Sequence, residues 1–167
     1  MAKATAAVEA NEIPSVDPLV TMSRVELVNI FFIGLTTGLI TWGLHQLLNK
    51  YLFTAVLCKG VATNDCARSP EYALMVASIL GAMVGLIALV RIRAYRPLLV
   101  VIGATFALWG FGGLFIGTLW YWALLIMAVM FGLAYALFSW LIRPRSFILA
   151  VVLAVVAVVI GRLVLSV

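Results

Sequence analysis

The amino-acid sequence predicts an all-α integral membrane protein, a bundle of five transmembrane helices. The first observation is composition: of 167 residues, 66% are hydrophobic and 10% are charged, and the mean hydropathy is +1.23. A soluble domain has about 45–50% apolar and about 25% charged residues, and a short chain leaves much of its surface outside. The second observation is that the apolar residues form long continuous runs, which favour helices over the alternating strands of a membrane barrel. The solvent around most of the chain is therefore predicted to be lipid.

The chain divides into a tail and one transmembrane domain. Residues 1–22 are polar and lack the apolar core of a signal peptide, so we expect a disordered cytoplasmic tail. Residues 23–167 form the five-helix transmembrane domain, because a spanning helix needs about 20 apolar residues and most of this part consists of such runs. The helices are expected at about residues 25–48, 71–90, 97–116, 119–142 and 146–165.

The helix ends carry recognisable signals. Glu26 lies in the first turn of the first helix, where a carboxylate suits the helix dipole. An extension of this helix through Tyr51 and Phe53 stays open. Pro97 and Pro144 precede apolar runs, and proline suits the first turn of a helix because its missing N–H has no partner there anyway.

The distribution of basic residues predicts the orientation. Seven of the 11 lysine and arginine residues lie beside helix ends on one side, and the arginines there form dense clusters. Cytoplasmic loops are enriched in such residues, so this side is predicted to be cytoplasmic, with the N-terminus inside and the C-terminus outside, in a bacterial inner membrane. The expected cytoplasmic anchors are Arg91, Arg93, Arg96, Arg143 and Arg145.

The chain has two cysteines, Cys58 and Cys66, in the polar segment that follows the first helix. The predicted orientation places them in the periplasm or outside the cell, where a disulfide persists. Closing so small a loop is worth roughly 2–3 kcal/mol in the chain-entropy model. The alternative is two unrelated thiols. His45 is the only histidine and cannot complete a metal site with them, so we expect no metal and no cofactor.

The second half of the chain contains a candidate repeat. Met83-Val84-Gly85-Leu86 and Met130-Phe131-Gly132-Leu133 lie 47 residues apart, and Arg96-Pro97 matches Arg143-Pro144 at the same offset. The repeated unit would be a helical hairpin, which would leave the first helix as a cap or a partner-facing element. Parallel repeats of this kind occur in transporters. The alternative is a chance match between apolar helices.

Small residues four apart occur in every predicted helix. They allow close approach of helices in lipid, where apolar side chains supply no hydrophobic drive for association. We therefore expect a compact bundle, with one stripe left for another subunit. The packing residues are Gly34, Gly38, Ala77, Gly81, Gly85, Gly113, Gly117, Ala128, Gly132 and Ala136.

One polar face follows the first helix. Thr37, Thr41 and His45 are four residues apart and so share a face, which predicts a candidate polar cavity or a contact with a polar partner. The alternative is that the threonines bond to their own helix backbone and that His45 lies near the headgroups. The chain has no HExxH motif and no phosphate-binding glycine loop, and helices two to four contain no Asp, Glu or Lys within the membrane.

These features predict a non-catalytic accessory or scaffold subunit of a membrane complex. The expected partners are the lipid bilayer and either further copies of the chain or a larger membrane protein, and no nucleic acid is expected, since no basic patch is interleaved with aromatic residues. The segment FFIGLTTGLITWGLHQLL, residues 31–48, resembles the opening helix of the GtrA-like small flippases, which have four helices. Two alternatives therefore stay open, a small oligomeric transporter or flippase for a lipid-linked substrate and a periplasmic redox or envelope sensor.

Overall fold

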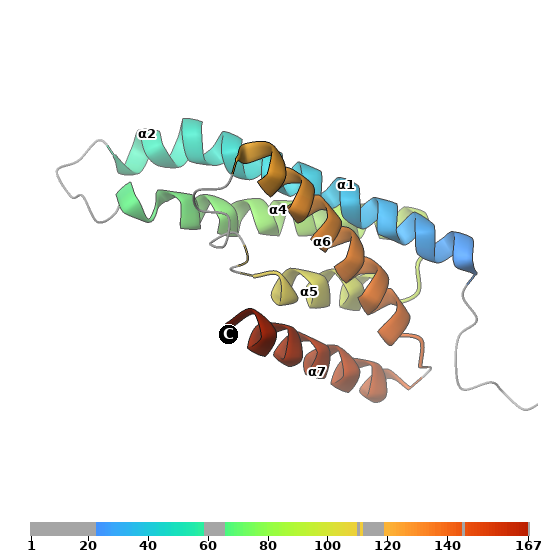
Figure 1. Ribbon diagram of the computed structural model, residues 1–167. Helices are drawn as coiled ribbons and strands as arrows, with labels where there is room; N and C mark the ends of the chain where they lie inside the picture. Colours follow the sequence, from blue (N-terminus) through green and yellow to red (C-terminus); the bar gives the residue numbers. More distant parts are fainter. Residues whose placement is uncertain (1–22, 59–65, 110, 112–118, 145, 167) are drawn as a thin grey trace, which may run out of the picture.

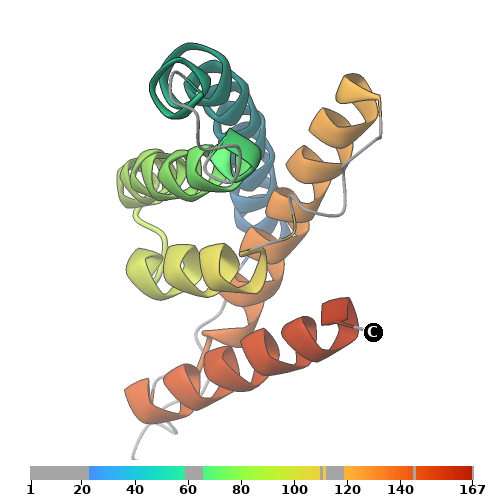
Figure 2. The same ribbon diagram turned by 90° about the vertical axis from the view of Figure 1, so that its left-hand side faces the viewer.

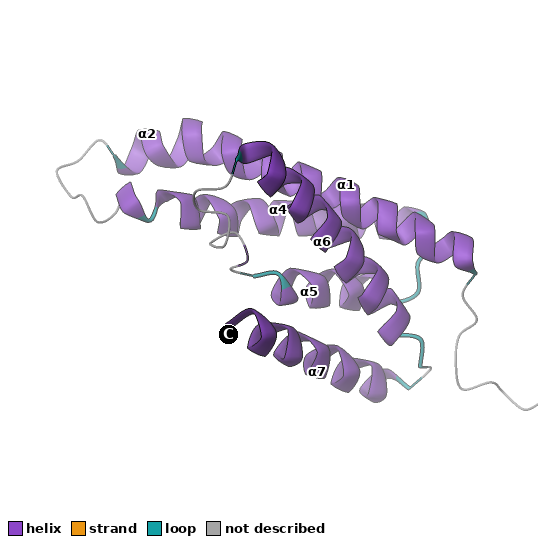
Figure 3. Ribbon diagram, viewed as in Figure 1, coloured by secondary structure: helices purple, strands orange, loops and turns teal. Residues whose placement is uncertain are grey.

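The computed structural model describes residues 23–58, 66–109, 111, 119–144 and 146–166. Helices make up nearly all of this part, which confirms the predicted all-α fold (Figures 1 and 3). The elements are α1 (Arg24–Leu48), the π-helix η1 (Asn49–Phe53), α2 (Thr54–Leu57), α4 (Ser69–Arg91), α5 (Pro97–Ala107), α6 (Trp120–Leu141) and α7 (Phe147–Ser166). The tail predicted over residues 1–22 lies outside the described residues.

The first helical segment is longer than the range predicted for it, residues 25–48. Ser23 caps it by accepting a hydrogen bond from the Glu26 backbone N–H at 3.1 Å, and α1 then runs without a break through η1 and α2. The predicted extension through Tyr51 and Phe53 is confirmed, and the helical segment reaches Leu57. The extra residue of the π turn is accommodated by the Thr54 hydroxyl, which donates to the Asn49 carbonyl at 2.6 Å.

Three helical segments are long and apolar enough to cross a membrane, namely Arg24–Leu57, Ser69–Arg91 and Trp120–Leu141. Two further apolar helices, α5 and α7, are shorter in the part that the structure describes. The third predicted helix, 97–116, was too long, because α5 ends at Ala107 with Leu108 as its C-cap. Glycines at 110, 112 and 113 follow closely, and each costs about 1 kcal/mol relative to alanine inside a helix.

The core is built around α1, which packs along both α4 and α6. Figure 2 shows α6 crossing α1 on the side away from α4, while α5 lies between α4 and α7 in both views. This central position does not fit a cap, which is one of the two roles that a repeat would leave to the first helix; the other, a partner-facing element, stays a prediction. The small and polar side chains of α1 let two other helices approach it closely from different sides.

Two turns meet at one end of the bundle, which we call the arginine end. Residues 92–96 join α4 to α5, and residues 142–146 join α6 to α7. The Arg96 guanidinium donates to the carbonyl oxygens of Pro144 and Ser146, each at 3.4 Å, and lies 5.4 Å from the centre of the Phe147 ring. The opposite end, which carries Cys58 and Cys66, is called the cysteine end.

The two Arg-Pro turns start their helices differently. Pro97 occupies the first turn of α5, as predicted, whereas Pro144 precedes α7 by three residues. Ser146 instead accepts a hydrogen bond from the Leu149 N–H at 3.5 Å. The second proline therefore lies before its helix rather than in the first turn, and the serine side chain satisfies a free N–H there. The start of α7 agrees with the predicted start at about residue 146.

Candidate functional site

The small residues of α1 and α6 pack against one another. A methyl group on Gly34 would lie 2.9 Å from the Gly132 Cα atom, and one on Gly38 would lie 2.8 Å from the Ala128 Cα atom. Both distances are too short for real Cβ contacts, so the two helix backbones approach as closely as their small residues permit. These two predicted stripes are therefore used inside the protomer.

The polar face of α1 packs against the small-residue stripe of α4. A methyl group on Gly81 would overlap the Thr41 side chain, and one on Gly85 would overlap the Tyr135 hydroxyl of α6 while approaching Thr37. Ala77 of the same stripe is fully buried. Ala136 is only partly buried, and Gly113 and Gly117 lie outside the described residues.

The two predicted threonines bond to their own helix. The Thr37 hydroxyl donates to the Ile33 carbonyl and the Thr41 hydroxyl to the Thr37 carbonyl, each at 2.8 Å. Both side chains are buried, at 1% and 0% exposure. Neither threonine lines the pocket that lies between α5 and α7.

His45 continues this face toward the cysteine end. Its Nε2 atom lies 3.4 Å from the Pro70 carbonyl oxygen, which can only accept, so this nitrogen carries the proton. The ring also lies 5.3 Å from the centre of the Trp42 ring. One turn further, the Ser69 hydroxyl donates to the Asn49 side-chain oxygen at 2.8 Å. His45 and Asn49 thus tie α1 and η1 to the start of α4.

Residues 49–58 and 66–72 form a helical hairpin whose two segments are joined to each other, and we call it the projecting hairpin. Phe53 stacks with Tyr72 at 6.5 Å between ring centres. Cys58 and Cys66 are joined at disulfide distance with their Cα atoms 4.9 Å apart, as the sequence predicts. Figure 1 shows α2 and the start of α4 extending past the other helices. The projecting hairpin is therefore held together by three contacts, namely the Asn49–Ser69 hydrogen bond, the Phe53–Tyr72 stack and the Cys58–Cys66 disulfide.

One exposed stripe of the projecting hairpin is apolar and is bordered by Lys50, whose Nζ atom lies 5.7 Å from the centre of the Tyr51 ring. Tyr51 is 69% exposed, Leu52 49% and Val56 65%. Sequence reasoning did not predict this surface, because in the sequence these residues look like the apolar end of a spanning helix with Tyr51 at the membrane interface. The π-helix beside them also escaped prediction, although such turns often mark functional sites.

Four of the five predicted cytoplasmic anchors lie at the arginine end within the described residues. Arg91 and Arg93 are exposed, Arg96 and Arg143 are half-buried, and Arg145 lies outside the described residues. Arg93 and Arg96 have left-handed backbone conformations, with φ of 55° and 51°. The hydrogen bonds from Arg96 to the Pro144 and Ser146 carbonyls stabilise the left-handed conformation of Arg96 itself. This conformation costs about 1–2 kcal/mol in residues other than glycine.

Comparison with protein-family models, with curated proteins and with solved structures finds no match to this chain. The resemblance of residues 31–48 to the opening helix of GtrA-like flippases therefore stays a prediction.

Proposed function

We propose that this chain is a multi-pass protein of the bacterial inner membrane and acts as a non-catalytic accessory or scaffold subunit. In this proposal the bundle anchors the chain, and the projecting hairpin holds a partner outside the membrane. The observation that carries the proposal is the exposed apolar face of a hairpin closed by a disulfide.

The surface of the bundle supports the membrane location. Large apolar side chains are exposed on every long helix, and α7 presents them around most of its circumference. Soluble monomers rarely expose apolar patches larger than a few hundred Å². Those of α7 are Phe147, Ile148, Leu149, Val152, Val155, Val156, Val159, Ile160 and Leu163.

The grouping of the turns supports the orientation. Arg96 brings both Arg-Pro turns together at the arginine end, so the basic residues of two different loops gather on one side. The start of α1 lies at the same end and the end of α7 at the other (Figure 1). We therefore propose that the arginine end is cytoplasmic, with the N-terminus inside and the C-terminus outside.

The length of the first helical segment supports a role for the projecting hairpin. Arg24–Leu57 has 34 residues, or about 50 Å at about 1.5 Å per residue, whereas the hydrocarbon core is about 30 Å thick. A segment that enters the hydrocarbon core near Arg24 leaves that core before Tyr51. With its headgroup regions the bilayer is about 40–45 Å thick, so only the end of the segment around Val56 lies beyond it. An exposed apolar patch at that point indicates a protein contact.

The packing of α1 favours this function over transport. A substrate pathway lined by Thr37 and Thr41 needs free hydroxyls beside a cavity. Here both hydroxyls are bonded to the helix backbone and sealed by Gly81 and Gly85 of α4. The close packing of this face suits a rigid support.

Site-specific photocrosslinking in intact membranes tests the proposal. A benzophenone side chain at Val56 should crosslink the chain to one discrete partner protein, and Val56→Asp should abolish co-purification of that partner. The matched control carries the same probe at Leu133, which is exposed on α6 within the bundle. The same adducts from both positions, adducts between two copies of the chain only, or no protein adduct at Val56 would each contradict the proposal.

A further inference from the structure

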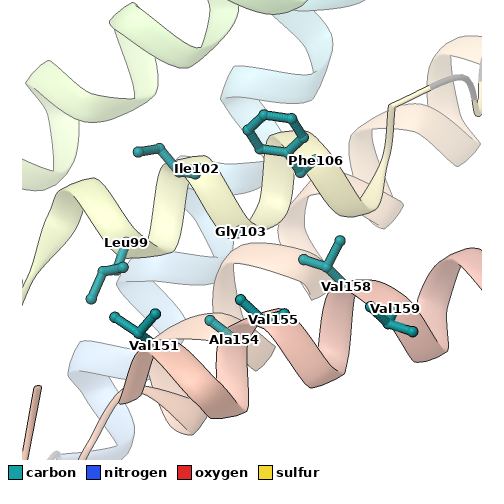
Figure 4. A pocket seen from close by; sticks show the side chains of 9 residues that line it. All are labelled: Leu99, Ile102, Gly103, Phe106, Val151, Ala154, Val155, Val158 and Val159. Carbon is teal, nitrogen blue, oxygen red and sulfur yellow. The ribbon is translucent and has the colours of Figure 1, made fainter. Parts of the chain in front are cut away.

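A groove with a volume of about 260 Å³ runs between α5 and α7. Leu99, Ile102 and Phe106 of α5 form one wall, and Gly103 forms part of the floor (Figure 4). The opposite wall consists of Val151, Ala154, Val155, Val158 and Val159 of α7. Every lining side chain is apolar, so the groove offers dispersion contacts and no hydrogen bond from a side chain.

The two helices that form the groove run in the same direction. Both start at the arginine end, and Leu99 and Val151 lie at that end of the groove while Phe106 and Val159 lie at the other (Figures 1 and 4). The groove therefore follows the helix axes. In the proposed orientation it lies along the direction of lipid acyl chains in the inner leaflet.

A basic side chain lies between the starts of α5 and α7, at the arginine end of the groove. Arg96 immediately precedes α5 and reaches across to the Phe147 ring at the start of α7. Arg143 lies in the adjacent turn, and its Nε atom is buried with no hydrogen-bond partner among the described residues. Arg91, the last residue of α4, and Arg93, in the turn before α5, are both exposed.

The helices that form the groove carry no carboxylate. The sequence contains no Asp or Glu after Glu71, and Glu71 itself lies near the start of α4, at the cysteine end. Among the described residues, Glu26 in the first turn of α1 is a carboxylate at the arginine end, where it is outnumbered by Arg24, Arg91, Arg93, Arg96 and Arg143. An apolar slot with a cationic mouth matches an apolar chain that ends in an anionic group.

We propose that the groove between α5 and α7 binds one acyl chain of an anionic phospholipid, whose phosphate lies against Arg96 and Arg143. Basic sites between helices on the cytoplasmic side of a membrane suit anionic headgroups. The lipid rather than a protein helix is the occupant, because an acyl chain fills a narrow apolar groove and needs no polar partner there. This proposal rests on the membrane location proposed above and is independent of the accessory role.

Native mass spectrometry of the delipidated full-length chain tests the site. Phosphatidylglycerol should bind at a concentration at least ten-fold lower than phosphatidylcholine with the same acyl chains. Val155→Trp fills the groove from α7 and should weaken binding of phosphatidylglycerol at least five-fold. Val156→Trp is the matched control, since Val156 is similarly exposed on α7 but does not line the groove. It should leave lipid binding unchanged.

A second pair of variants tests the headgroup contact. Arg96→Gln keeps N–H donors for the carbonyls of Pro144 and Ser146 but removes the charge, so it should abolish the preference for phosphatidylglycerol over phosphatidylcholine. Arg68→Gln removes an exposed charge at the cysteine end and should leave the preference intact.

Several outcomes would overturn the lipid site. These are equal binding of the two lipids, equal effects of the Val155 and Val156 substitutions, and full competition by inorganic phosphate, which would indicate a site for a free anion. Dimers that form in place of lipid adducts and are lost in Val155→Trp would indicate a second copy in the groove. Membrane fractionation of the same cells distinguishes the two failures. A chain that fractionates with the membrane but shows none of the expected lipid binding lacks the lipid site, whereas a chain found outside the membrane fraction contradicts the proposed location.

Discussion

Gly34 illustrates how one residue sets the spacing of two helices. Its missing side chain leaves room for the Phe131 carbonyl oxygen and the Tyr135 Cβ atom of α6, both of which would lie 2.8 Å from an added methyl group. Neither atom is the far end of a flexible side chain. Relief would require movement of the α6 backbone, so the contact tolerates glycine alone.

Gly34→Ala should therefore destabilise the protein by roughly 1–3 kcal/mol, the usual cost of overpacking. Gly43→Ala is the control, because nothing lies within 4 Å of the Cβ atom it would add. That change should be neutral or stabilise by up to about 1 kcal/mol, since alanine favours the helix. Thermal unfolding in detergent measures both. Equal unfolding temperatures for the two variants would show that the close contact between α1 and α6 does not require glycine at position 34.

At the scale of elements, the projecting hairpin depends on contacts between its two helical segments. The Asn49–Ser69 hydrogen bond and the Phe53–Tyr72 stack lie below the disulfide. Farther from the cysteine end, α1 packs against both α4 and α6. The disulfide therefore closes the far end of a structure whose base is already packed.

Replacing both cysteines by serine should loosen the hairpin and leave the bundle intact. The free energy of unfolding should fall by roughly 2–3 kcal/mol in the chain-entropy model. Hydrogen exchange should rise in residues 54–58 and 66–69 and stay unchanged in α6. Reductant should reproduce the effect in the parent chain and add nothing in the serine variant. A uniform rise over all helices would mean that the disulfide supports the whole fold.

At the scale of the whole molecule, the arginine and cysteine ends lie at opposite ends of the long helices (Figure 1). This arrangement links two features that are far apart in the sequence, the Arg-Pro turns and the disulfide. A membrane between the two ends would place them in different compartments. The basic turns would then lie in a reducing one and the cysteines in an oxidising one.

Single cysteines in a background with Cys58 and Cys66 replaced by serine test this arrangement. Ala67→Cys in the projecting hairpin should react with a membrane-impermeant maleimide in intact cells. Tyr95→Cys in the α4–α5 turn, where the tyrosine is 41% exposed, should react only after the cells are opened. Labelling of Tyr95→Cys in intact cells would refute the proposed orientation, and labelling of both sites only in opened cells would show that the projecting hairpin does not lie outside the cell.

Several local expectations could be made from the sequence because they depend on neighbours along the chain. The start of α1 beside Glu26, the position of Pro97 at the start of α5 and the pairing of Cys58 with Cys66 are of this kind. The end of α5 at Ala107 was missed because hydrophobicity carried the prediction through residues 110–113, where glycine opposes a helix.

By itself, the sequence determined that the chain is helical and apolar, where most helices lie, and that small residues recur on their faces. These properties follow from composition and periodicity, which need no knowledge of what lies opposite. Tertiary structure decided that Gly34 and Gly38 meet Ala128 and Gly132, that Thr37 and Thr41 are sealed by α4, and that α5 and α7 enclose a groove. The physical reason is that many faces in this chain offer similar small residues, and only the three-dimensional packing selects which of them meet.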